Sequence, residues 1–449
     1  MLRKIKETLS LKLNLTPTKL KILKNVYWAF IGKIAGMAAQ LLVGILIARY
    51  LGPSKYGLMN YIMSYVAIFG VISEFGLSNI EIRELSSSPE KRNSILGSAF
   101  GVRLLLTSIA YMSIIASLLV FKVDRFSCMM ILAYALSLFA SPFTVIRNYF
   151  TSIIQNEYVV KTELIRIILG SLIKVALLLI VAPLEYFILA VAFDAVIVAS
   201  GYVYNYHQKV GKLRDWKFQK SDAKYLVIQG FPLLLSSAAI IVYNKIDQVM
   251  IGNMLDNAEV GYYATAEKFL SLILFLPGVL VQTVTPLLVN KYKNDYEGYL
   301  TMRQQFVNIV VWSTILISSF ISSFSYLLVS LTFGSEYLAA VPVLQIVSWK
   351  TVGNAIYDSS GQLIILEKKQ KWAAIRNVIG CFVNIVLNLI LIPLYGIVGS
   401  AFVAVVTIFS SGFFANSIIP PYRGIFKVQM KSLLYGWKDI FRVKSLIIK

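Results

Sequence analysis

Long apolar stretches recur along almost the whole chain, and short polar segments separate them. Each stretch holds the ~20 mostly apolar residues that an α-helix needs to cross the hydrocarbon core of a bilayer. None shows the short segments of alternating hydrophobicity that are typical of membrane β-barrels. The pattern predicts an all-α polytopic membrane protein with twelve transmembrane helices, at 25–48, 58–80, 95–121, 126–150, 164–183, 186–206, 225–252, 262–290, 305–333, 341–366, 373–392 and 398–419.

The lysines and arginines of the polar segments predict how these helices are oriented. With the N-terminus placed in the cytoplasm, the two tails and the even-numbered loops hold 30 basic residues, whereas the odd-numbered loops hold 4. Cytoplasmic loops carry an excess of Lys and Arg over loops on the other side. Both termini are therefore expected in the cytoplasm, and most of the net charge of +21 reflects this orientation rather than a ligand.

The overall composition excludes several other classes of protein. Hydrophobic residues make up 57% of the chain and charged residues only 14%, whereas a typical soluble domain has ~25% charged residues. A nucleic-acid-binding surface is built from solvated Lys and Arg, so no nucleic-acid partner is expected. The two cysteines and the single histidine have no metal-ligand spacing, so neither a metal site nor a bound cofactor is expected.

The two halves of the chain resemble each other. ELIRIILGSLIKVALLLIVAP (163–183) aligns with AAIRNVIGCFVNIVLNLILIP (373–393) at an offset of 210, and LGPSKYGLMNY (51–61) aligns with LDNAEVGYYAT (255–265) at an offset of 204. We therefore expect two six-helix lobes around a central cavity, related by an axis along the membrane normal. The expected organisation is a basic N-terminal segment (1–24), an N-lobe (25–206), a basic linker (207–224), a C-lobe (225–419) and a basic C-terminal tail (420–449).

Fourteen charged residues fall inside the predicted helices, nine basic and five acidic. A charge at the bilayer centre costs ~2.5–3.5 kcal/mol on insertion scales, so these side chains are expected to face a partner, a cavity or the interface. Five lie more than one turn from either helix end, which favours a polar interior: Lys33, Arg103, Lys174, Lys350 and Asp358. Three lie within a turn of a cytoplasmic end, where snorkelling to the headgroups is the alternative: Arg147, Arg166 and Arg376.

Polar residues also recur at helical spacing, which places them on common helix faces. The three resulting stripes are Arg166–Gly170–Lys174, Arg376–Gly380–Asn384–Asn388 and Lys33–Gln40. Packing of small and polar residues between helices is the alternative, although it does not explain Lys174. We expect the stripes to line one shared cavity, whose positive charge suits an anionic headgroup such as pyrophosphate.

Several motifs carry a family resemblance, in order and over nearly the whole chain. The run ARYLGPSKYG (48–57) resembles the ARxLGPxxYG turn after the first helix of polysaccharide flippases of the Wzx type. Further matching segments are VGYY (260–263), FGSEY (333–337) and IPLYGIVG (392–399). The resemblance implies a flippase for undecaprenyl-pyrophosphate-linked oligosaccharide repeat units, such as O-antigen in lipopolysaccharide biosynthesis. It also implies alternating access, no enzymatic activity, and a location in the bacterial inner membrane.

The acidic residues inside the helices leave two interpretations open. In the first interpretation, they form ion pairs with nearby basic residues. In the second, Glu74, Asp247 or Asp358 binds a coupling ion, either H⁺ or Na⁺. An ion-coupled multidrug extruder of the same superfamily remains the alternative function. A membrane polysaccharide polymerase or ligase is the alternative of another class, although its catalytic motifs are absent from the sequence. The expected partners are membrane lipid and the lipid-linked oligosaccharide. Polymerase and chain-length proteins, which act on the flipped unit, are expected as further partners.

Overall fold

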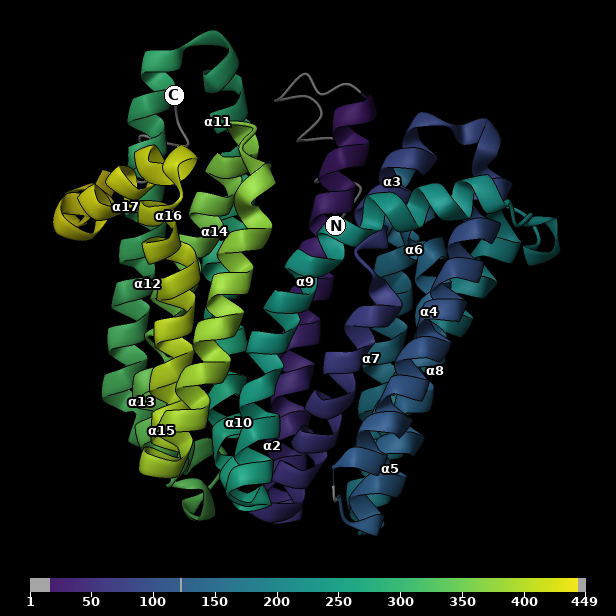
Figure 1. Cartoon of the computed structure of the whole chain (residues 1–449), viewed down its shortest axis with the longest axis vertical. Helices are drawn as coiled ribbons and strands as arrows, with labels where there is room; N and C mark the ends of the chain where they lie inside the picture. The colour runs from purple at the N-terminus through teal and green to yellow at the C-terminus, as the bar shows by residue number, and fades with distance from the viewer. Residues whose placement is uncertain (1–16, 122, 443–449) are drawn as a thin grey trace, which may run out of the picture.

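The computed structural model describes residues 17–121 and 123–442, and every regular element in these ranges is helical (Figure 1). Within these ranges, the side chains of 17–35, 37, 272, 275, 276, 282 and 440–442 lie outside the description. The predicted site residue Lys33 is among them, so only its place in a helix is known. The all-α prediction is confirmed for the described part of the chain.

The helices follow one another with short turns between them. Their bounds are α2 Pro17–Glu74, α3 Leu77–Ser87, α4 Arg92–Val120, α5 Arg125–Ala135, α6 Thr144–Ser152, α7 Asn156–Leu179, α8 Leu184–Lys209, α9 Lys220–Met254, α10 Asn257–Ile273, α11 Phe275–Asn294, α12 Tyr296–Thr332, α13 Ala340–Val347, α14 Lys350–Leu366, α15 Ala373–Phe409, α16 Ala415–Ile418 and α17 Arg423–Tyr435. A 3₁₀ segment, Leu136–Phe143, joins α5 to α6, and a π-helical turn, Ser410–Phe414, joins α15 to α16.

Seven helical runs of the described residues are long and apolar enough to cross a membrane. The twelve predicted stretches do not map one to one onto these runs. Two runs contain a break and hold two stretches each, and the stretches 164–183, 262–290 and 341–366 lie on helices outside the seven runs. Gly52 (φ 72°, ψ 170°) divides α2, and Gly396 (φ 59°, ψ −143°) divides α15. Both glycines have a positive φ, which costs a residue with a Cβ ~1 kcal/mol or more. A multi-pass helical membrane protein is shown, and the count of twelve spans stays a prediction.

The helices form two groups with a shared middle. Figure 1 shows α4–α8 on one side and α11–α17 on the other, with α2, α9 and α10 between them. The buried apolar side chains form three clusters: one within each group, and a third that joins them. Ala48 of α2, Tyr263 of α10 and Tyr337 all belong to the joining cluster. The halves are therefore in apolar contact near the turns that follow Ala48 and Met254.

The repeated segments 51–61 and 255–265 pack against each other reciprocally. A Cβ added to Gly57 would overlap the carbonyl oxygen of Asn257, and a Cβ added to Gly261 would overlap that of Pro53. At the offset of 204, Gly57 matches Gly261 and Pro53 matches Asn257. Each half thus makes the same backbone contact with the other, as a two-fold relation between them requires.

Hydrogen bonds reinforce this end of the molecule. The Tyr337 hydroxyl donates to the Ala48 carbonyl (2.7 Å), and Arg49 donates to the Leu331 carbonyl (2.6 Å). In the described ranges, these are the only hydrogen bonds found between residues 25–206 and residues beyond 300. The two groups of helices are therefore closed against each other at the end that holds Ala48 and Tyr337.

Candidate functional site

A cavity of about 260 Å³ lies among α2, α7, α8 and α10. Four of its lining residues belong to the predicted stripes: Gln40, Arg166, Gly170 and Lys174. Because Arg166, Gly170 and Lys174 are four residues apart on α7, one helix face presents all three to the cavity. The structure thus brings Gln40 of α2 and the α7 stripe to one cavity.

Three basic side chains and one acidic side chain line this cavity, which we call the cationic cavity. Lys174 Nζ lies 2.5 Å from Asp194 Oδ2, and Arg166 Nη1 lies 4.0 Å from the same oxygen. Arg166 also pairs with Glu163 at 3.0 Å. The third base is Lys268 of α10, whose ammonium lies beside Gly44. Since Asp194 offsets only one of these charges, the lining carries a net positive charge.

Gly170 makes room for the carboxylate that pairs with Lys174. A Cβ at this position would overlap Asp194 Oδ1. We expect Gly170→Ala to displace Asp194 and to lower the free energy of unfolding by ~1–3 kcal/mol, as overpacking does. Thermal unfolding of the purified protein in detergent measures this, with Gly424→Ala as the control because a Cβ there meets no atom within 4 Å. An unchanged midpoint for Gly170→Ala would contradict the expected overlap.

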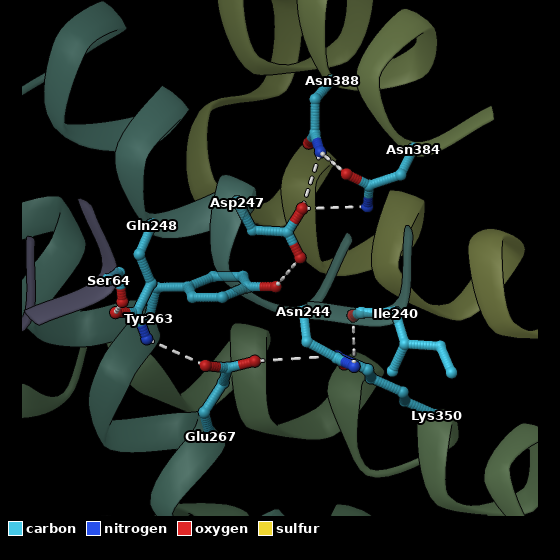
Figure 2. A network of polar contacts seen from close by, with 10 residues as sticks. All are labelled: Ser64, Ile240, Asn244, Asp247, Gln248, Tyr263, Glu267, Lys350, Asn384 and Asn388. Carbon is cyan, nitrogen blue, oxygen red and sulfur yellow. Dashed lines mark hydrogen bonds and ion pairs between the residues drawn. The ribbon is translucent and has the colours of Figure 1, made fainter. Parts of the chain in front are cut away.

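A second polar site centres on Asp247 of α9, whose side chain is fully buried. Figure 2 shows its carboxylate between α10 and α15. Oδ2 accepts a hydrogen bond from the Tyr263 hydroxyl (2.8 Å), and Oδ1 accepts from Nδ2 of Asn384 (2.9 Å) and of Asn388 (2.7 Å). In the described part of the chain, no basic side chain lies within ion-pair distance of this carboxylate. Asp247 is thus a buried carboxylate held by three neutral donors.

Neighbouring side chains connect this site to α2 and α14. Gln248 donates to Glu267 (2.8 Å), and Ser64 of α2 donates to Gln248 (2.5 Å) (Figure 2). Lys350 of α14 lies 3.6 Å from the other oxygen of Glu267. Lys350, predicted to face a polar interior, is therefore paired with an acid of α10. The chain of contacts joins the two halves close to Asp247.

The other predicted site residues lie apart from both sites. Arg103 is buried and donates to Glu81 at 2.7 Å, with Asn148 donating to the same carboxylate at 2.6 Å. Arg376 is 3% exposed, lies 4.0 Å from the centre of the Tyr357 ring and donates to Ser360. Neither arginine lines the cationic cavity.

The second predicted stripe does not share the cavity of the first. Asn384 and Asn388 face Asp247 inside the C-terminal half.

The three remaining candidates, Arg147, Glu74 and Asp358, are exposed on their helices. Glu74 lines a separate hollow between α2 and the α5–α6 segment. One shared cavity for both stripes was the expectation, and the described side chains form two distinct polar sites instead.

Several important side chains were not selected from the sequence. Asp194 and Lys268 complete the cationic cavity, and Tyr263, Gln248 and Glu267 complete the Asp247 site. Asp194, Lys268 and Glu267 were visible as charges within apolar stretches, which was a usable signal. Tyr263 and Gln248 are uncharged, so they carried no such signal.

One family model and one curated relative match much of the chain. The family model for "Polysaccharide biosynthesis protein" matches residues 22–291. The probable low-salt glycan biosynthesis flippase Agl15 of Haloferax volcanii is 25% identical over 455 residues, covering 93% of this chain and 90% of the relative.

Solved structures share the fold. The lipid II flippase MurJ in an inward closed conformation matches with a TM-score of 0.67 at 16% identity, covering 93% of this chain and 92% of that one. An inward-facing multidrug transporter of the MATE family matches with a TM-score of 0.62 at 14% identity, covering 91% and 96%. The chain is thus a multi-pass membrane protein with the fold of MOP-superfamily transporters, and it belongs to the polysaccharide biosynthesis protein family.

Proposed function

We propose that the protein is a flippase for a lipid-linked oligosaccharide joined to its carrier through pyrophosphate. The cationic cavity carries this proposal, since three basic groups line it against one acid. Guanidinium and ammonium groups bind phosphate oxygens through charge-assisted hydrogen bonds, which are about twice as strong as neutral ones. The pyrophosphate would occupy the cavity while the prenyl chain stays in lipid, and the two halves would then change their relative orientation.

The cargo we propose is an undecaprenyl-pyrophosphate-linked repeat unit, such as that of O-antigen, moved from the cytoplasmic to the outer leaflet of the bacterial inner membrane. Agl15, a probable glycan biosynthesis flippase, supports the glycan class of this cargo. Polymerase and chain-length proteins would then use the flipped unit.

We also propose the topology expected from the charge distribution: twelve spans, both termini cytoplasmic, and lobes at 25–206 and 225–419. In that topology, the end that holds Ala48 and Tyr337 is the outer end. In that topology, the closure at this end corresponds to an inward-facing state.

Removal of two positive charges from the cavity tests the cargo. Lys174→Gln combined with Lys268→Gln is expected to lower translocation about tenfold or more, because each lost charge-assisted bond is worth ~1.5–3 kcal/mol. The measurement follows lipid-linked sugar that becomes accessible to an added glycosidase on the far leaflet of reconstituted vesicles. Lys291→Gln with Lys293→Gln, at exposed positions in the last turn of α11, is the charge-matched control. Equal translocation by both double variants would contradict the proposed role.

Asp247 is the coupling group we propose among the three acidic candidates. Its carboxylate and the Asn388 amide oxygen, which has no partner among the described residues, supply the oxygen ligands that a hard cation takes. A carboxylate can equally exchange a proton, so H⁺ and Na⁺ both remain candidates. Glu74 and Asp358 are exposed, so neither has a comparable set of buried partners.

An ion-coupled multidrug extruder is the second candidate function, because the fold is shared with a MATE transporter. The positive lining of the cationic cavity opposes lipophilic cations, which are typical drug substrates. Transport of a cationic dye into reconstituted vesicles, with no transport of anionic lipid-linked sugar, would favour the extruder.

A further inference from the structure

The C-terminal helix α17 differs from the membrane-spanning helices in direction and in its contacts. Figure 1 shows that it crosses the C-terminal group of helices instead of running along them. Polar side chains of α12 hold it: Trp312 donates to the Ser432 carbonyl (2.8 Å) and Gln304 donates to the Val428 carbonyl (3.0 Å). The turn after it is held by Asn308, which donates to Asp439 (2.7 Å).

Two helices place α17 at the level of a bilayer surface. Trp312, which holds α17, lies 20 residues before Thr332, the last residue of α12. At 1.5 Å per residue, the two residues are about 30 Å apart along the helix. From the break at Gly396 to Ile418, just before α17, the chain rises by about 33 Å in the same way. Both lengths match the ~30 Å hydrocarbon core. α17 therefore lies one core thickness from the opposite end of the spanning helices, where headgroups begin.

The surface of α17 divides into three sectors. One faces the protein and is formed by Ile425, Val428, Gln429 and Ser432. At about 100° per residue, a second sector is apolar: Phe426 and Leu433 are half-buried against the core of the C-terminal group, whereas Met430 and Leu434 are exposed. The third sector is basic and contains Arg423, Lys427 and Lys431, four residues apart and all exposed. Leu434 is 59% exposed beside this basic row, so an apolar and a basic sector adjoin on the free surface.

The end of α17 and the 3₁₀ turn that follows it, Gly436–Arg442, add aromatic side chains and a cavity. Tyr435 and Trp437 are 58% and 52% exposed, and such rings are enriched at the headgroup level of membranes. A cavity of about 580 Å³ lies between α12 and this turn, lined by three basic side chains and one acidic one. The basic ones are Arg303, Lys431 and Lys438.

We propose that α17 and the turn after it are a membrane-surface anchor that binds phosphate-bearing headgroups of anionic bilayer lipids. The apolar sector lies in the acyl boundary, as in amphipathic helices that lie in the interface plane. The basic row and the cavity beside Lys431 and Lys438 bind the lipid phosphates. A free anion offers nothing to the apolar sector, whereas a lipid satisfies both sectors at once.

Accessibility in bilayers of defined composition tests the anchor with the full-length protein. A cysteine is placed at Leu434 (59% exposed) or at Tyr296 (57% exposed), with Cys128→Ser and Cys381→Ser removing the native thiols. Tyr296 begins α12, about 54 Å from Thr332, and so lies well outside the hydrocarbon core. In nanodiscs containing phosphatidylglycerol, we expect an aqueous maleimide to label Leu434→Cys about tenfold more slowly than Tyr296→Cys. Equal labelling rates would overturn the anchor.

The lipid charge is tested by replacing the basic row. In phosphatidylglycerol, Leu434→Cys is expected to be better protected from the maleimide than in phosphatidylcholine. A triple variant with Arg423→Gln, Lys427→Gln and Lys431→Gln is expected to lose this extra protection. The control is a second triple variant at exposed positions in and beside the linker, with Lys209→Gln, Arg214→Gln and Lys220→Gln. It removes the same charge and is expected to leave the protection of Leu434→Cys intact. The lipid assignment is overturned if the two triple variants behave alike. It is also overturned if inorganic phosphate, added to phosphatidylcholine nanodiscs, protects Leu434→Cys as well as phosphatidylglycerol does.

Discussion

Asp247→Leu is expected to lower the free energy of unfolding by ~3–5 kcal/mol, the largest effect that we expect from any single substitution in the described chain. Three donors, from Tyr263, Asn384 and Asn388, point at this one buried carboxylate. Without it, they remain buried and unpaired, at ~1–3 kcal/mol for each donor that finds no new partner. Thermal unfolding in detergent micelles, followed by size-exclusion chromatography, measures the loss.

Asp358→Leu is the matched control for this substitution, since it removes a carboxylate that is exposed. It is expected to change the free energy of unfolding by less than ~1 kcal/mol. A similar loss in both variants would show that the Asp247 contacts are not what makes that position sensitive.

The isosteric change Asp247→Asn separates stability from coupling. It removes the charge while it keeps the size of the side chain, so most of the packing is retained. If Asp247 is the coupling group, the variant should translocate cargo at a rate that no longer follows a Na⁺ or H⁺ gradient. Imposing one gradient at a time on proteoliposomes identifies the ion, and an unchanged gradient dependence would assign coupling elsewhere.

Gly57→Ala and Gly261→Ala are each expected to open the closed end of the molecule. Either Cβ would overlap a backbone oxygen of the other half, and backbone cannot rotate away as a flexible side chain can. At the ~1–3 kcal/mol typical of overpacking, the closed state loses about tenfold in population. A cysteine in place of the buried Ala48 reports this as faster labelling by a membrane-impermeant maleimide.

The matched control is Gly278→Ala, because a Cβ there meets no atom within 4 Å. It should leave the labelling of the cysteine at position 48 unchanged. Monodisperse elution of all three variants ensures that labelling reports a change of state and not unfolding. Slow labelling in Gly57→Ala and Gly261→Ala would show that the halves close without this contact.

The helical class and the α7 side of the cationic cavity were predictable because they depend on local periodicity. Apolar length indicates a spanning helix, and residues four apart share a face whatever the tertiary structure. For this reason the sequence groups Arg166, Gly170 and Lys174 on one helix face, and all three line the cationic cavity.

The partners of these residues depend on how helices are placed beside one another, which periodicity does not specify. Asp194 reaches Lys174 from α8, and Lys268 reaches the same cavity from α10. The matching stripe in the second half has the same spacing, yet Asn384 and Asn388 meet Asp247 because α15 packs on α9. Sequence similarity between the halves therefore predicted equivalent helices, but not equivalent surroundings.

The reciprocal packing of Gly57 and Gly261 bears on the origin of the chain. In an isologous interface between identical subunits, residue i of one subunit contacts residue j of the other, and residue j of the first contacts residue i of the second. The two glycine contacts follow this pattern. A chain of half this length could have formed it as a homodimer, with one glycine supplying both contacts. After duplication and fusion, the backbone at the two contacts had to stay matched while the side chains were free to differ. Pro53 in one half and Asn257 in the other occupy equivalent positions, and each supplies the backbone oxygen of its contact. Their different side chains are an example of this divergence.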